Sequence, residues 1–267
     1  KSFHGRTLGA LAATGQPKYH VGFEPMIPGF SYAKFNDLSS VEALIDDKTC
    51  AVIVEPIQAE GGIHLPDDGF LAGLKALCDA NGALLILDEV QVGCGRTGSF
   101  FAYEQENVKP DIVTLAKALG GGLPIGAMIT SEKVSDGFAP GAHGSTFSGN
   151  ALACRCGLTV LEVMEEDNLL AHVTETGQWF GERLEQLASD HSTVASARGR
   201  GFIWALALNG PHAREVMDGC TKRGLLVNKL NDETIRFLPP LIAQRSHLRA
   251  AIDILAQVLT DLERGER

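Results

Sequence analysis

Two hydrophobic patterns alternate along the first half of the chain. Continuous apolar runs of strand length cover residues 49–56 and 83–90. Between them, residues 68–80 carry apolar side chains at helical spacing, with Asp68 placed to cap the start and Gly82 to end the helix. Strands that are apolar on both faces and separated by helices are typical of a parallel sheet covered on both sides. The pattern therefore predicts an α/β fold.

The pattern changes after a long predicted helix at residues 150–166, whose apolar positions are expected to face inward: Leu152, Leu158, Leu161 and Met164. Beyond it we expect an amphipathic helix at 169–187, strands at 201–208 and 225–230, and a closing helix at 246–263. We place a domain boundary near residue 165. Residues 1–165 then form a large domain, and residues 166–267 form a smaller C-terminal α+β domain.

Ionisable residues stand where the predicted strands of the large domain end. Glu55 ends the first strand, Asp88 and Glu89 end the second, and Lys117 follows a third apolar run just before three glycines. In open α/β sheets, ligands bind beyond the carboxyl ends of the strands. Taken singly, each group could be a cap or a lysine that reaches the surface. Groups from three strands at one sheet edge indicate a site.

A lysine at this edge can act as a nucleophile toward a carbonyl. If the carbonyl belongs to pyridoxal phosphate, an acid must hold the proton on the ring nitrogen, and Asp88 on the neighbouring strand fits that role. The cofactor also needs a flat apolar face, phosphate ligands and a partner for its ring hydroxyl. Phe3, the Ser145–Thr146 pair and Gln91 can supply these groups, although each could also be a core, turn or surface residue.

A second motif points elsewhere. Gly93-x-Gly95-x-x-Gly98 matches the dinucleotide-binding fingerprint. In that fingerprint the glycines follow the strand directly and open a helix, whereas here DEVQ intervenes and no clear amphipathic helix follows. We interpret the motif as a flexible glycine loop, and a dehydrogenase remains the least favoured alternative.

Composition narrows the possible partners. The 267 residues are 45% hydrophobic and 21% charged, with a net charge of −10, which argues against nucleic acid or an anionic membrane as partner. Cys154-x-Cys156 is too tightly spaced for a zinc knuckle, so we expect core thiols and no metal. Unpatterned cysteines favour a reduced, cytoplasmic protein.

Long motifs carry a family resemblance over nearly the whole chain: SFHGRTLGAL, VEPIQAEGGI, LILDEVQVGCGRTG, TLAKALGGGLPIGAM, HGSTFSGNALA and IRFLPPLI. They resemble the class III (ω-amino-acid) aminotransferases, pyridoxal-phosphate enzymes of fold type I, and within them the acetylornithine aminotransferases. The resemblance implies a mostly parallel sheet flanked by helices.

The resemblance also assigns the cofactor site. It implies that Lys117 binds pyridoxal 5'-phosphate covalently and that Asp88 pairs with the pyridine nitrogen. Val90 would pack on one face of the ring and Phe3 on the other, while Gln91, in the DEVQ motif with Glu89, binds the ring hydroxyl. In the same way, Thr146 would reach the phosphate of a neighbouring subunit's cofactor, which implies a homodimer with shared active sites.

The implied reaction moves the terminal amine of N2-acetyl-L-ornithine to 2-oxoglutarate, giving N-acetyl-L-glutamate 5-semialdehyde and L-glutamate in arginine biosynthesis. Arg6 would bind a substrate carboxylate and Ser145 would approach the substrate. Arg236 resembles the family's second carboxylate arginine, and Glu60 its switching partner. Ornithine, succinylornithine, succinyldiaminopimelate and 4-aminobutyrate are alternative donors.

The chain departs from the family pattern in a few places. Ala59, Val92 and Ser148 replace a glycine, a threonine and a glycine that are common there, and none of these changes removes a catalytic group. The chain also starts inside a motif, so we expect an upstream segment that holds a phosphate-binding loop. A non-enzymatic remnant without that loop remains a second hypothesis.

Overall fold

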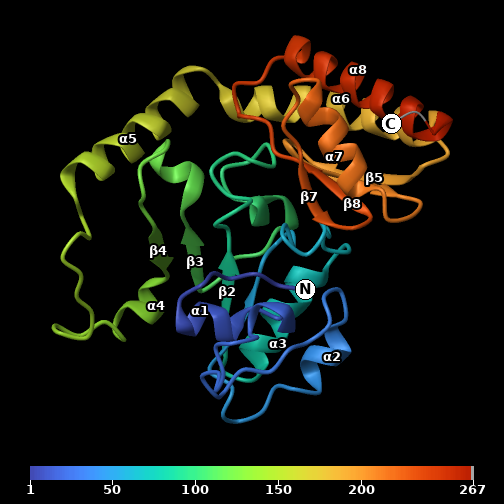
Figure 1. Cartoon of the computed structure of the whole chain (residues 1–267). Coiled ribbons are helices and arrows are strands. Elements are labelled where there is room, and N and C mark those ends of the chain that lie inside the picture. Colours follow the sequence, from blue (N-terminus) through green and yellow to red (C-terminus); the bar gives the residue numbers. More distant parts are fainter. Residues whose placement is uncertain (266–267) are drawn as a thin grey trace.

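The computed structural model describes residues 1–265 and contains two separate four-stranded sheets (Figure 1). The first has the order β1 (Ala51–Val54), β2 (Leu84–Asp88), β3 (Ile112–Leu115) and β4 (Ala127–Thr130). β1, β2 and β3 are parallel, and β4 runs antiparallel to β3. The predicted mostly parallel sheet is therefore confirmed.

The register of this sheet brings the polar strand ends together. Val54 pairs with Leu87, and Asp88 pairs with Thr114. The residues that follow, Glu55, Glu89 and Ala116, therefore leave the sheet at the same edge. Lys117 comes next and begins the short 3-10 helix η3 (Lys117–Gly120).

Helix α3 (Phe70–Ala80) covers the first sheet through a core that includes Leu71, Leu74 and Leu85. The prediction that Asp68 caps this helix is wrong. Gly69 occupies the N-cap position in the left-handed region, with φ 80°, and no side chain caps the helix. A left-handed N-cap suits glycine because it has no Cβ.

Short helices complete residues 1–165, the proposed large domain. Three of them precede β1: α1 (Leu8–Ala13), η1 (Pro17–Tyr19) and α2 (Leu38–Glu42). The 3-10 helix η2 (Ala102–Glu106) follows β2, and α4 (Glu132–Ser135) follows β4.

The second sheet is antiparallel, with the order β5 (Val194–Arg200), β6 (Ile203–Leu208), β8 (Thr234–Phe237) and β7 (Asn228–Asn231). The remaining helices pack with it around a buried core: α6 (Leu169–Asp190), α7 (Ala213–Lys222) and α8 (Arg245–Arg264). β5 was not predicted because its sequence, VASARGR, is largely polar, and β7 begins three residues later than expected.

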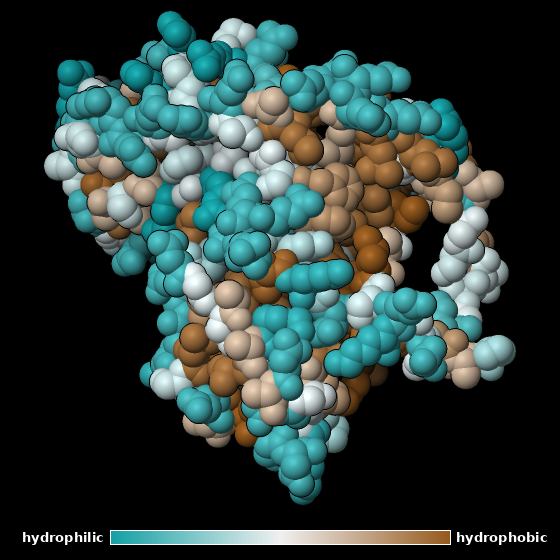
Figure 2. Space-filling view, turned by 180° about the vertical axis from the view of Figure 1, so that it is seen from behind, coloured by the Kyte–Doolittle hydropathy of each residue, from teal (hydrophilic) through white to brown (hydrophobic). Residues whose placement is uncertain are grey.

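Helix α5 (Ala151–Glu166) forms as predicted, with Asn150 as its N-cap, but its burial was predicted wrongly. Met164 is buried, whereas Leu152 and Leu158 are 66% and 53% exposed and Leu161 is 37% exposed. The expected core thiol Cys154 is exposed as well. Periodicity identifies an apolar face but not what covers it, and hydrophobic side chains gather over α5 and β4 on the surface (Figure 2).

A third, small core joins the two sheets. Ile57, Ala59, Ile63, Val92 and Ala102 from the first part pack against Ile203 and Ala205 of β6. The glycine loop contributes a polar link, since Arg96 donates a hydrogen bond to the carbonyl of Phe202 at 3.3 Å. The loop is thus packed against the second sheet. The domain boundary near residue 165, inside α5, is kept as a proposal.

Within residues 1–265, no helix has both the length and the apolar composition needed to cross a membrane.

Candidate active site

A small cavity of about 120 Å³ opens where the parallel strands end. Phe3, Gly5, Val90, Gln91 and Lys117 line it, together with His4, Glu55 and Asp88. The lining comes from the N-terminal segment and from the turns after β1, β2 and β3. The sheet register thus converts groups that are far apart in the sequence into one site.

Asp88 is buried in this cavity and held by three donors. Its Oδ1 accepts hydrogen bonds from the backbone N–H of Val90 and the hydroxyl of Thr114, both at 3.0 Å. Its Oδ2 lies 2.8 Å from Nδ1 of His4, whose side chain is 2% exposed. Contacts on both oxygens fix the plane of the carboxylate, so its orientation does not depend on a ligand.

Lys117 occupies a strained position at the mouth of the cavity. Its φ of 47° lies in the left-handed region, where a residue with a Cβ is uncommon and strain often marks a functional site. The residue keeps an exposed surface, yet burial of the amine lowers its pKa, Glu60 opposes this, and Arg236 adds to it. A lowered pKa increases the fraction of neutral, nucleophilic amine.

Two buried glutamates, Glu55 and Glu89, lie near Asp88 and accept hydrogen bonds from different segments of the chain. Glu55 accepts hydrogen bonds from the N–H of Phe3 at 2.8 Å and of Ala59 at 3.2 Å, so it ties the N-terminal segment to the sheet. Glu89 accepts from the N–H of Ala102 and Tyr103, both at 3.0 Å, and does not line the cavity. Burial raises the pKa of each to about 7.

An ion pair lies beside Lys117. Nη1 of Arg236 is 2.6 Å from Oε1 of Glu60, and the arginine is largely buried. Gln91 bridges the pair, donating to Glu60 at 3.0 Å and accepting from Arg236 at 2.9 Å. Partial burial opposes ionisation of Glu60, but the hydrogen bond and charge of Arg236 outweigh it and lower the pKa of the carboxyl. The structure thus brings the two predicted switch residues into contact.

Three other predicted residues lie outside the cavity lining. Arg6 is exposed, and its guanidinium lies 4.4 Å from the ring centre of Tyr19 and 5.6 Å from that of Phe3. Ser145 and Thr146 are exposed on the segment between α4 and α5, which leaves the body of the molecule (Figure 1). Their roles toward phosphate and substrate therefore stay predictions.

Two residues at the site were not singled out from the sequence. His4 lies inside the SFHGRTLGAL motif, and its buried Nε2 has no hydrogen-bond partner among residues 1–265. Asn228 accepts a hydrogen bond from Nη2 of Arg236 at 2.9 Å. The position of His4 next to Phe3 was the one available signal for it, whereas nothing in the local pattern marks Asn228.

The cavity suits the ring of pyridoxal phosphate. Phe3 and Val90 supply apolar surface, Asp88 a buried carboxylate, and Lys117 an amine whose pKa is lowered. Its volume is below the roughly 300–1,000 Å³ of pockets that enclose a whole small ligand. The fit therefore concerns the ring end, because the expected phosphate ligand Thr146 does not line this space.

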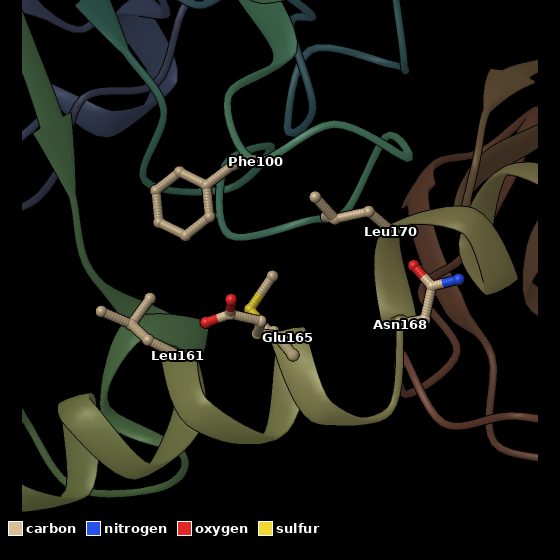
Figure 3. A pocket seen from close by; sticks show the side chains of 6 residues that line it. Phe100, Leu161, Glu165, Asn168 and Leu170 are labelled. Carbon is tan, nitrogen blue, oxygen red and sulfur yellow. The ribbon is translucent and has the colours of Figure 1, made fainter.

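A larger hollow of about 280 Å³ lies between α5, the start of α6 and the glycine loop (Figure 3). Its lining consists of Phe100, Leu161, Met164, Glu165, Asn168 and Leu170. It is mainly apolar and lacks the amine and carboxylate set of the smaller cavity. The chemistry therefore points to the smaller one.

Comparison with known proteins identifies the family of the chain. The family model for class III aminotransferases matches residues 1–259. Acetylornithine aminotransferase of Aquifex aeolicus is 49% identical over 261 residues, which are 97% of this chain and 66% of that protein. Succinylornithine transaminase of Yersinia pseudotuberculosis is 46% identical over 258 residues, or 96% of this chain and 62% of that protein. The chain thus spans just under two thirds of the length of these relatives.

A solved structure supports the fold. Ornithine aminotransferase of Toxoplasma gondii, described with partial occupancy of pyridoxal phosphate at its active site, superposes with a TM-score of 0.94 at 32% identity. The match covers 99% of this chain and 63% of that one. The family model spans both sheets and every residue of the cavity, so the chain belongs to the class III aminotransferases.

Proposed function

We propose that the chain carries the catalytic centre of an aminotransferase that moves the terminal amine of N2-acetyl-L-ornithine to 2-oxoglutarate. One observation carries the proposal: Lys117 and Asp88 line the same cavity, and the Glu60–Arg236 pair lies beside it. This arrangement combines a nucleophilic amine, an acid for a ring nitrogen and an arginine for a carboxylate.

Pyridoxal phosphate, when bound, supplies the electron sink that lets a proton leave the carbon next to the amine. Asp88 would hold the proton on the ring nitrogen. Lys117 would bind the cofactor, and its Nζ would take up the proton that leaves the substrate carbon, because its amine reaches the cavity and its pKa is lowered. Phe3 and Val90 would confine the ring, and Gln91 would bind its hydroxyl.

The Glu60–Arg236 pair addresses a problem of specificity. The acceptor 2-oxoglutarate carries two carboxylates, whereas the part of the amine donor near the reacting carbon carries none. With the donor bound, Glu60 would neutralise Arg236, as the 2.6 Å contact allows. With the acceptor bound, Arg236 would be free for its α-carboxylate, while Arg6 binds the other end.

The donor assignment draws support from the curated relatives, several of which are named acetylornithine aminotransferase at 44–49% identity. Succinylornithine is the second candidate donor because a relative of that name is 46% identical. The two donors share the reacting amine and differ in their acyl groups. Ornithine and 4-aminobutyrate are less favoured.

A homodimer completes the proposal. Met128 and Ile129 of β4 and Leu152 and Leu158 of α5 are exposed apolar residues, and Thr146 lies on the projecting segment before α5. A second subunit would cover such a surface and receive Thr146. The six cysteines are free thiols, which supports a reducing compartment such as the cytoplasm.

The test combines a spectrum with peptide mapping. The protein incubated with pyridoxal phosphate should gain an absorbance band that acetylornithine changes faster than succinylornithine, ornithine or 4-aminobutyrate does. Borohydride should then attach the cofactor to Lys117, and Lys117→Ala should abolish turnover. The exposed Lys109→Ala is the control. Label on another lysine would overturn the assignment, and absence of a band would favour the non-enzymatic hypothesis.

A further inference from the structure

Arg236 is held from two directions by partners of different kinds. Glu60 and Gln91 reach it from the turns after β1 and β2, in the first sheet. Asn228 reaches it from its own sheet, where the two residues are directly paired across β7 and β8. Oδ1 of Asn228 accepts from Nη2 of Arg236 at 2.9 Å. One contact is therefore set by strand register, and the others depend on how the two sheets meet.

The partners also differ in charge. Glu60 is a carboxylate, so a substrate carboxylate competes with it for the same guanidinium. Asn228 and Gln91 are neutral amides, which can hold the guanidinium without cancelling its charge. A planar guanidinium recognises a carboxylate through two parallel hydrogen bonds, and this requires a fixed plane. When Glu60 gives way, Gln91 still accepts from Nη1 of Arg236, and Asn228 is the acceptor that holds Nη2, so both are needed to fix the plane.

We propose that Asn228 is a positioning residue for the dicarboxylate substrate: it keeps the guanidinium of Arg236 in place when Glu60 gives way to a substrate carboxylate. The inference rests on the proposed function, because it needs Arg236 to bind 2-oxoglutarate. It predicts that both the acceptor oxygen and the neutrality of Asn228 matter. A carboxylate at residue 228 would bind Arg236 as firmly as Glu60 does, and no substrate step would displace it.

The experiment compares Asn228→Leu and Asn228→Asp with Asn231→Asp in the cofactor-loaded protein. Asn231 lies on the same strand and accepts a hydrogen bond from the N–H of Glu233, so an aspartate there keeps the acceptor and adds the same charge. Two quantities are measured: binding of glutarate, an unreactive dicarboxylate, by calorimetry, and the single-turnover rate of each half-reaction.

Asn228→Leu and Asn228→Asp should each weaken the binding of glutarate and of 2-oxoglutarate about 10-fold. This is the lower end of the range for the loss of a hydrogen bond to a charged group, because Asn228 is exposed. The acetylornithine half-reaction and the control should stay unchanged. Wild-type glutarate affinity in either variant would overturn the inference, as would an equal loss in both half-reactions, which marks a merely structural residue. If the proposed function itself fails, the wild-type protein will transaminate neither substrate.

Discussion

The imidazole of His4 lies 2.8 Å from the carboxylate of Asp88, across 84 positions of sequence. Both side chains are almost fully buried, and the other ring nitrogen of His4 has no partner in the part of the chain that the structure describes. The imidazole of His4 therefore makes one polar contact there, and that contact is to the acid that would face the ring nitrogen of the cofactor. This arrangement suits a residue that positions Asp88.

Replacing His4 tests this relationship. His4→Phe keeps a ring of similar shape and removes the contact, so Asp88 should lose its orientation while Lys117 still binds the cofactor. A hydrogen bond to a charged group contributes about 1.5–3 kcal/mol, or roughly 10–150-fold. We expect turnover to fall by that factor, with a changed pH profile of the cofactor's absorbance. His247→Phe, at an exposed position of α8, is the control. An unchanged profile would leave His4 as packing only.

Asp88→Asn tests the acid itself. A neutral amide cannot stabilise the proton on the ring nitrogen, so the variant should retain cofactor and lose most activity, roughly 10²- to 10³-fold for the removal of one preorganised electrostatic group. Rates and absorbance of the loaded variant give the answer. Asp253→Asn, exposed on α8, controls for a general loss of charge. Near-normal turnover would mean that Asp88 has only a structural role, through its hydrogen bond to Thr114 on the neighbouring strand.

Arg236 and Glu60 should separate the two half-reactions, whereas Arg6 should act in both. Arg6→Lys should weaken the binding of acetylornithine and of glutamate, and Arg236→Lys should mainly weaken the binding of glutamate, each about 10- to 150-fold, because an ammonium lacks the planar fork. Glu60→Gln removes the charged partner seen at 2.6 Å and should favour glutamate over the amine donor. Single-turnover rates with each donor decide. Equal effects of Arg236→Lys or Glu60→Gln on both donors would contradict a switch, and no effect would mark an ordinary ion pair.

Glu89 makes stability depend on pH in an unusual direction. Burial raises its pKa from 4.5 to about 7, so the folded protein binds this proton more tightly than the unfolded chain does. The stabilisation is therefore present below about pH 4.5 and is lost as the pH rises through about 7. The difference corresponds to roughly 3 kcal/mol at 1.36 kcal/mol per pH unit.

Glu89→Gln removes this titration and one of the two acceptors for Ala102 and Tyr103. The variant should be less stable than the wild type at pH 5, and the gap should shrink at pH 8.5. Unfolding free energies from denaturant titrations at both pH values measure this. The exposed Glu185→Gln serves as control. A gap that does not change with pH would show that Glu89 is ionised throughout.

The sequence by itself determined the parallel strands of the first sheet, the long helices, and the edge at which chemistry is expected. β1, β2 and β3 are short apolar runs; Asp88 ends β2, and Glu55 and Lys117 follow β1 and β3, so the strand direction alone places these groups together. The family motifs added roles to residues that are contiguous in the chain. Both kinds of information are local, because hydrophobic period and motif order can be read within a short window.

The tertiary structure alone decided the contacts between distant segments. His4 meets Asp88, Asn228 meets Arg236, and the carboxylate of Glu89 turns from the cavity to the N–H groups of Ala102 and Tyr103. It also left the predicted inner face of α5 exposed. These outcomes depend on how two sheets and their loops pack against each other. A polar side chain forms a hydrogen bond with whichever partner this packing brings within about 3 Å. The local sequence pattern does not specify that partner.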